Sequence, residues 1–122
     1  MRKARNIGLA VLCAAGLTLA VAPAQAGKTP TKKRTVKVED YYFSPAKLTV
    51  KKNTIVVWRW PKAGGDGHDV VLVKGPRRVK KFASEVFFAD EVYRKRLRVP
   101  GRYRIVCSLH PDDMKQTITV KR

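Results

Sequence analysis

Short runs in which apolar and polar residues alternate recur along most of this chain, with turn signals between them. This period of two residues is typical of half-buried strands, because successive side chains of a strand point to opposite faces of its sheet. No segment shows the sustained period of a helix. Many short strands of this kind predict an all-β fold, an antiparallel Greek-key sandwich or barrel. We expect strands at residues 36–39, 48–51, 54–60, 68–73, 93–99, 102–107 and 115–121.

The alternation also indicates which side chains share the inward face of each strand. These residues are Val36, Val38, Leu48, Val50, Val56, Trp58, Trp60, Tyr93, Lys95, Leu97, Val99, Tyr103, Ile105, Cys107, Ile118 and Val120. The segment 82–90 fits either a loop or a short helix, and we expect Phe87 and Phe88 in the core. His68 opens one expected strand and Cys107 ends another, so the loops 64–67 and 108–113 are expected at the same pole of the sandwich.

The first 26 residues have the pattern of a secretory signal peptide. Three basic residues precede an apolar run from Ile7 to Val21, and Ala24-Gln25-Ala26 forms a small-x-small cleavage pattern before Gly27. The apolar run is shorter than the ~20 residues that a spanning helix needs. We therefore expect residues 1–26 to be a signal peptide, a mature chain without a transmembrane segment, and a periplasmic, extracellular or cell-envelope location. Residues 27–34 are basic with nothing apolar to bury, so a flexible tail is expected there, followed by one domain at residues 35–122.

Cys107 is the only cysteine after the predicted leader, so no intramolecular disulfide can form. A single exported cysteine indicates an intermolecular bridge, a reactive thiol or a metal ligand. His110 and Met114 follow Cys107 closely, and His68 lies upstream, which favours ligation. One thiolate, two imidazoles and one thioether are the ligand set of a type 1 copper site. Zinc is the competing metal, but it gains little from a thioether.

The charge of the predicted mature chain restricts its partners. Residues 27–122 contain 24 basic and nine acidic residues, a formal charge of +15. Export and the lack of a recognition motif or aromatic ladder argue against nucleic acid binding. The charge favours either steering toward a redox partner with an acidic docking surface or association with an anionic cell envelope. A third reading, that it only keeps the protein soluble, stays open.

Three stretches of the chain match parts of a known pattern. An opening hairpin is matched by residues 43–50, and a strand followed by a ligand is matched by Trp58 with His68. The turn and strand that deliver a thiolate are matched by residues 99–107. In these stretches and in its ligand loop, the chain resembles the cupredoxin family, the exported blue copper proteins that include plastocyanin, azurin and amicyanin. The resemblance covers nearly all of the mature chain and implies a cupredoxin-like copper-binding domain. It implies His68, Cys107 and His110 as equatorial ligands of one type 1 copper per chain, with Met114 as the axial ligand.

Two departures from the family pattern concern the ligand loop and its neighbour. The Cys-x2-His spacing resembles plastocyanin and amicyanin, whereas the three residues between His110 and Met114 are closer to the azurin interval. Asp69 follows His68 where better-known members carry an asparagine whose amide bonds across to the loop with the thiolate. An ionised aspartate cannot donate that bond, so Asp69 is expected beside the ligands as a residue that favours Cu(II) and lowers the reduction potential.

The resemblance also implies how electrons would reach the metal. Leu109 and Pro111 flank His110, and in the family such apolar residues surround the imidazole edge that serves as the electron port. Multicopper oxidases and copper nitrite reductases need further histidines, and both histidines of this chain are already assigned. We therefore expect a non-enzymatic one-electron carrier. The alternative is a copper-binding or delivery protein outside the cytoplasm.

Overall fold

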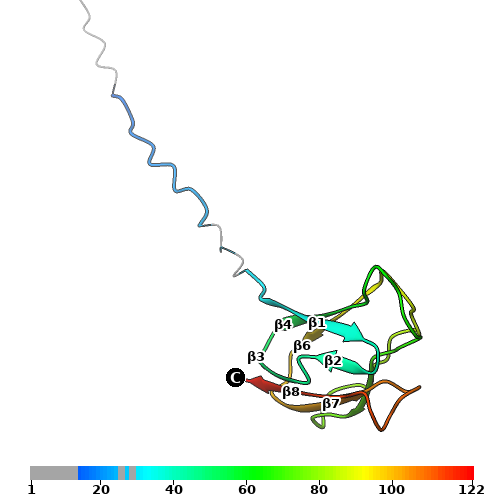
Figure 1. Cartoon of the computed structure of the whole chain (residues 1–122). Helices are drawn as coiled ribbons and strands as arrows, with labels where there is room; N and C mark the ends of the chain where they lie inside the picture. Colours follow the sequence, from blue (N-terminus) through cyan, green and yellow to red (C-terminus); the bar gives the residue numbers. More distant parts are fainter. Residues whose placement is uncertain (1–13, 25–26, 28–29) are drawn as a thin grey trace, which may run out of the picture.

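The computed structural model describes residues 14–24, 27 and 30–122. Two four-stranded sheets lie face to face, and the described residues before Lys33 extend away from them (Figure 1). The strands are β1 (Lys33–Glu39), β2 (Tyr42–Ser44), β3 (Lys47–Lys51), β4 (Thr54–Arg59), β5 (Val71–Lys74), β6 (Val92–Leu97), β7 (Gly101–Val106) and β8 (Lys115–Lys121). The all-β sandwich expected from the sequence is confirmed, and no described residue is helical.

The predicted signal peptide falls partly outside the described residues, because residues 1–13, 25 and 26 are not among them. Residues 14–24 belong to no helix or strand, and their side chains are exposed. None of the described residues forms a helix of the length and hydropathy that crossing a bilayer requires.

The pairing of the strands is mixed rather than wholly antiparallel. One sheet has the order β2-β1-β4-β6 and the other has the order β3-β8-β7-β5. The pairs β1–β4 and β3–β8 are parallel, and the remaining pairs are antiparallel. Parallel neighbours cannot be joined by a tight hairpin. Here the chain crosses to the other sheet between β2 and β3 and returns in β4, which brings β4 beside β1 in the same direction.

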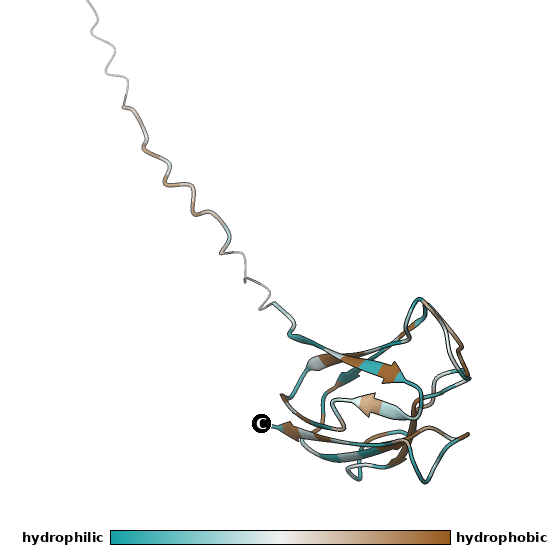
Figure 2. Cartoon of the chain, viewed as in Figure 1, coloured by the Kyte–Doolittle hydropathy of each residue, from teal (hydrophilic) through white to brown (hydrophobic). Residues whose placement is uncertain are grey.

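The core fills the space between the two sheets. The strands alternate between hydrophilic and hydrophobic residues along their length (Figure 2), and the alternating pattern predicted the inward residues of β1, β3, β7 and β8 correctly. Burial of these apolar side chains is the main force that holds the sheets together. The largest fully buried side chains include Trp58, Trp60, Tyr103, Phe43, Leu72, Leu97, Ile105 and Met114.

Two predicted boundaries were wrong. β1 begins at Lys33, inside the segment expected to be a flexible tail, because Lys33 and Arg34 pair with Ile55 and Val56 through the backbone while their own side chains stay exposed. His68 does not open a continuous strand, since β5 begins at Val71. His68 instead forms an isolated antiparallel bridge with Phe87.

The segment 82–90 is a loop without a helix, and its two neighbouring phenylalanines differ in burial. Phe87 packs against the core, with its ring centroid 5.1 Å from that of Trp60. Phe88, which we expected in the core, is 63% exposed. Consecutive residues of an extended segment point to opposite sides, so only one of the two can face inward.

The two ends of the sandwich differ in what they contain. We call the end where β1, β4 and β7 finish and β6 and β8 begin the site pole, because His68 and the loop after Cys107 lie there. The opposite end, where β1 and β4 begin and β3 and β8 finish, is the basic pole.

Candidate metal centre

Three of the predicted ligands come together at the site pole from two separate parts of the chain. One ligand atom from each of His68, Cys107 and His110 lies within 4.8 Å of the others. The Cys107 sulfur is 3.8 Å from Nδ1 of His68 and 3.6 Å from Nδ1 of His110. His68 is supplied by the segment between β4 and β5, whereas Cys107 and His110 belong to the connection between β7 and β8.

These separations fit a metal between the three residues. Metal–thiolate bonds are about 2.3 Å and metal–imidazole bonds about 2.0 Å, so a trigonal arrangement requires sulfur and nitrogen to be about 3.7 Å apart. Both imidazoles present Nδ1 toward the same sulfur, as ligation by these atoms requires. The donor set and its spacing therefore suit a thiophilic metal ion.

Backbone hydrogen bonds close the ligand loop around the site. The amide of Cys107 donates to the carbonyl of Met114 at 3.1 Å, and the amide of Met114 donates to the carbonyl of His110 at 2.9 Å. Met114 is fully buried and is thus held beside two of the other ligands. Cys107 and Met114 are fully inaccessible and His68 is 2% exposed, so solvent reaches only the His110 side.

The orientation of His68 depends on Asp40, a residue that the sequence did not single out. Nε2 of His68 lies 2.8 Å from Oδ1 of Asp40, which leaves Nδ1 free to face Cys107. A carboxylate on the second ring nitrogen selects the tautomer and makes the imidazole a better ligand. The same hydrogen bond, together with one from the Asp66 amide, holds the pKa of Asp40 below its usual value.

The loop before His68 packs closely against this carboxylate. A Cβ at Gly65 would lie 2.6 Å from Oδ1 of Asp40, so only glycine leaves room for it. The Tyr41 hydroxyl donates to Asp66, which raises the pKa of Tyr41. The Tyr41 ring meets the His110 ring edge-on with centroids 4.9 Å apart. The turn after β1 therefore contacts both imidazoles of the site.

Asp69 contacts the ligand loop as an acceptor. Its carboxylate accepts the amide of Ser108 at 2.6 Å and the hydroxyl of Ser108 at 2.5 Å. Asp69 is buried, and Ser108 directly follows Cys107. The bridge between the two ligand-bearing segments is thus made by Asp69 even though it cannot donate. Its negative charge lies close to the thiolate.

The residues of the predicted port lie at the surface of the site pole. Leu109 is 50% exposed, Pro111 is exposed and His110 is half-buried. An apolar side chain thus lies at the surface beside a partly exposed imidazole.

The comparisons with known proteins agree with this geometry. The family model for the cupredoxin-like domain matches residues 9–120. The chain belongs to the cupredoxin-like family. The His68, Cys107, His110 and Met114 cluster of this cupredoxin is consistent with a type 1 copper site. A search of curated proteins found no match.

Solved structures similar to this cupredoxin fall into two groups. A copper-containing nitrite reductase from Thermus scotoductus SA-01 is 27% identical with a TM-score of 0.64, over 84% of this chain but only 25% of the reductase chain. A reduced amicyanin variant is 19% identical with a TM-score of 0.64, over 77% of this chain and 87% of the amicyanin. An oxidized amicyanin variant is 21% identical with a TM-score of 0.62, over 71% and 80% of the two chains. The cupredoxin thus corresponds to most of an amicyanin and to a quarter of the reductase.

Replacing Asp69 with asparagine is expected to raise the reduction potential of the copper-loaded cupredoxin by tens of millivolts. The substitution removes a buried negative charge that favours Cu(II), while the remaining carbonyl oxygen can still accept the Ser108 amide. Voltammetry of both proteins measures the difference. An unchanged or lowered potential would contradict the role assigned to Asp69, and Asp112→Asn, at an exposed position of the same pole, serves as the control.

Proposed function

We propose that this cupredoxin is an exported carrier of single electrons that holds one type 1 copper ion. His68, Cys107 and His110 would be its equatorial ligands and Met114 its axial ligand. Copper bound by this set would supply a one-electron couple in a geometry between those preferred by Cu(I) and Cu(II). The observation that carries the proposal is the thiolate and two imidazoles already gathered at metal-ligating distances in a nearly closed site.

The protein residues contribute rigidity and access. Asp40 holds His68, Asp69 holds the start of the ligand loop, and backbone hydrogen bonds fasten Met114. A site held in this way changes little when its metal changes charge, which favours fast electron exchange. His110 and Leu109 provide the surface through which a redox partner would exchange the electron.

The proposal of a non-enzymatic role rests on the number of histidines in the chain. Both histidines of the chain belong to the proposed copper site, so no further imidazole is left for a second catalytic copper. The nitrite reductase that resembles this chain matches it over only 25% of the reductase's own length. The amicyanins, which match over most of their length, support a role for the single domain by itself.

The net charge led us to expect a redox partner with an acidic docking surface, and this partner stays a prediction; the charges around the port bear on how it would dock. The acidic residues of this cupredoxin gather around the site pole, in the loops that also carry the port: Asp40, Asp66, Asp69, Asp112 and Asp113. We therefore propose that a partner meets the port mainly through Leu109 and the His110 edge, while the net positive charge steers it from a distance.

Reversible voltammetry with copper retained tests the carrier role. We expect repeated one-electron oxidation and reduction without loss of metal in the presence of a Cu(I) chelator. Leu109→Asn should slow electron self-exchange by about tenfold, the cost of losing an apolar contact at the centre of a small interface. Val73→Asn, an exposed apolar residue on β5, is the matched control. Rapid transfer of copper to the chelator or to an apo-acceptor on reduction would replace the carrier role with copper delivery.

A further inference from the structure

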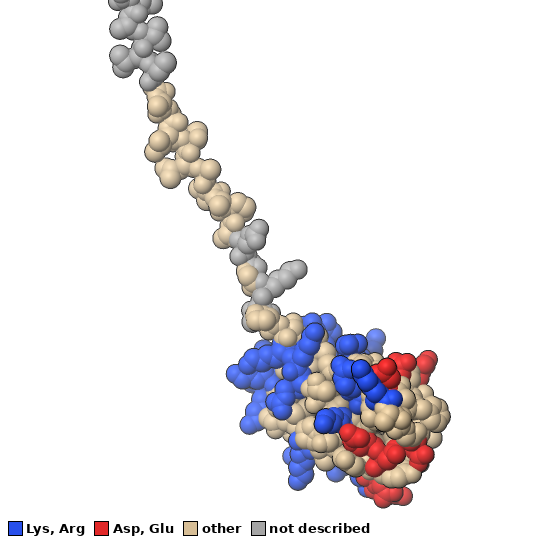
Figure 3. All heavy atoms as spheres, turned by 45° about the horizontal axis from the view of Figure 1, so that its top comes forward, with Lys and Arg blue, Asp and Glu red and all other residues tan. Residues whose placement is uncertain are grey.

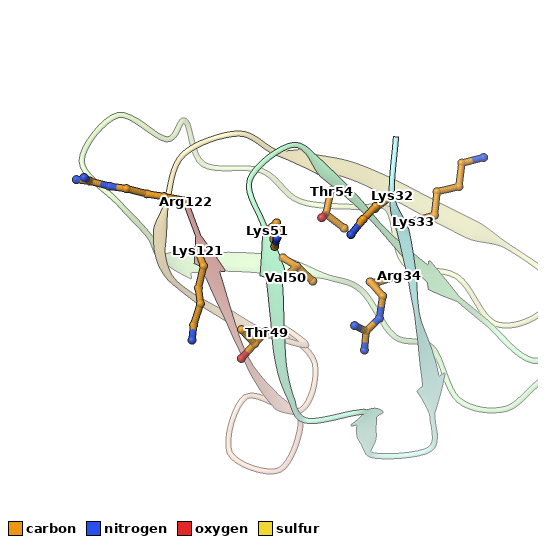
Figure 4. A pocket seen from close by; sticks show the side chains of 9 residues that line it. All are labelled: Lys32, Lys33, Arg34, Thr49, Val50, Lys51, Thr54, Lys121 and Arg122. Atoms are coloured by element: carbon orange, nitrogen blue, oxygen red, sulfur yellow. The ribbon is translucent and has the colours of Figure 1, made fainter. Parts of the chain in front are cut away.

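The basic pole concentrates positive charge at the end of the sandwich farthest from the copper site. It consists of eight exposed basic residues: Lys32, Lys33, Arg34, Lys51, Lys52, Arg96, Lys121 and Arg122. They line two adjoining pockets that share Lys32, Lys51 and Thr54, and neither pocket is lined by an acidic residue. Figure 4 shows that cations of the first pocket come from the start of β1 and the ends of β3 and β8.

The acidic residues lie away from this patch. Six of the nine lie in loops, turns or strand ends toward the site pole. The other three lie in the segment 82–91, in which Phe87 forms the bridge with His68. Figure 3 shows most of the blue atoms on the side of the N-terminal segment and the red atoms on the other side, where some blue atoms lie beside them. Among the described residues, the one salt bridge joins His68 to Asp40, so no cation of the basic pole is neutralised by a carboxylate. Eight like charges at one end repel each other, and an external polyanion would relieve that repulsion.

A redox partner is a poor occupant of this end. β8 has seven residues and spans about 20 Å from the site pole to the basic pole at ~3.4 Å per residue. Electron transfer slows steeply with distance, so a partner docked here would exchange electrons far less readily than one at His110. The basic pole therefore serves another purpose than electron exchange.

The composition of the basic pole favours a flat anionic surface over a specific protein. Protein interfaces are anchored by buried aromatic and apolar residues. The exposed large apolar residues of the domain lie elsewhere, namely Tyr41, Tyr42, Val73, Val86, Phe88 and Leu109. Apart from lysine and arginine, the pockets of the basic pole are lined mainly by small polar residues such as Thr49, Asn53 and Thr54, and by no aromatic residue. This is the arrangement by which polybasic segments bind phospholipid headgroups.

We propose that the basic pole attaches the protein to the surface of an anionic phospholipid membrane. The carboxylates of the site pole are repelled by the same surface, so attachment fixes the orientation as well as the position. The site pole then points away from the membrane, and the port at Leu109 and His110 stays open to a redox partner. Attachment does not require copper, and it is therefore independent of the proposed electron transfer.

Sedimentation with lipid vesicles tests the attachment. The exported protein, isolated with its own N-terminus and loaded with copper, is mixed with vesicles of phosphatidylcholine alone or of phosphatidylcholine with phosphatidylglycerol. Each basic residue near an anionic surface strengthens binding by about fivefold. We expect binding only to vesicles with phosphatidylglycerol, loss of that binding at high salt, and a decrease of about a hundredfold in the triple variant Lys51→Glu, Lys52→Glu and Arg96→Glu.

A second triple variant separates the pole from the net charge. Lys47→Glu, Arg59→Glu and Lys62→Glu change the formal charge equally at exposed positions of the site-pole end, where β3 begins and β4 finishes. We expect this variant to keep most of the vesicle binding. Equal losses of vesicle binding in the two variants, or binding to neither kind of vesicle, would overturn the proposal. Release of the protein from vesicles by an acidic protein or a nucleic acid, added at the same total charge as the lipid, would also overturn it. The visible band of the bound copper reports that each variant is folded, and binding by the apoprotein shows that attachment stands apart from redox function.

Discussion

Replacing Cys107 with alanine is expected to abolish the intense visible absorption of the copper-loaded protein. That band requires charge transfer from a thiolate bound closely to Cu(II), and Cys107 is the one cysteine in the described part of the chain. The remaining imidazoles would bind Cu(II) as an ordinary site. We expect the affinity for Cu(II) to fall by more than about a hundredfold, because loss of even an outer-shell partner costs ten- to hundredfold. Optical titration with Cu(II) and competition with a chelator measure both effects.

Leu109→Ala is the matched control for the loss of Cys107. It lies two residues further along the same loop, its side chain is half exposed, and it donates nothing to the metal. The control should retain the band and the affinity. A band of unchanged intensity in Cys107→Ala, or a colourless parent protein, would remove the type 1 copper assignment and bring zinc back as the candidate metal.

The candidate ligands could be picked out from the sequence because their residue types are rare in this chain. The chain has two histidines, and residues 27–122 have one cysteine and one methionine. No other set of soft ligands could form, so the chemistry did not depend on knowing the fold. The inward residues of the strands were predictable for a similar reason, since a strand alternates its faces whatever it pairs with.

What depends on tertiary pairing was missed. Asp40 lies 28 residues before His68, and only the β1–β4 pairing and the packing of the intervening loop bring them together. A period of two residues carries no information on whether neighbouring strands are parallel, so the mixed sheets were also not predicted. The grouping of the acidic residues was not apparent either, because they are scattered through a mostly basic sequence and come together only when strand ends are sorted to two poles.

Asp40→Ala is expected to weaken copper binding by about ten- to hundredfold, the usual cost of losing the partner of a ligating histidine. Without the carboxylate 2.8 Å from Nε2, the His68 ring loses the contact that directs Nδ1 toward Cys107. The visible band should persist but shift, because the thiolate remains while one imidazole is less well oriented. Chelator competition and the optical spectrum of the copper-loaded variant measure the two effects.

Two further substitutions separate orientation from charge at this position. Asp40→Asn keeps an acceptor oxygen for Nε2 and removes the negative charge, so recovery of most of the affinity would show that the hydrogen bond orients His68. Asp112→Ala removes an exposed carboxylate from the same pole without touching His68 and should leave the affinity unchanged. If Asp112→Ala weakened copper binding as much as Asp40→Ala, the effect would come from the general negative potential of the site pole. The specific hydrogen bond between Asp40 and His68 would then have no part in holding the metal.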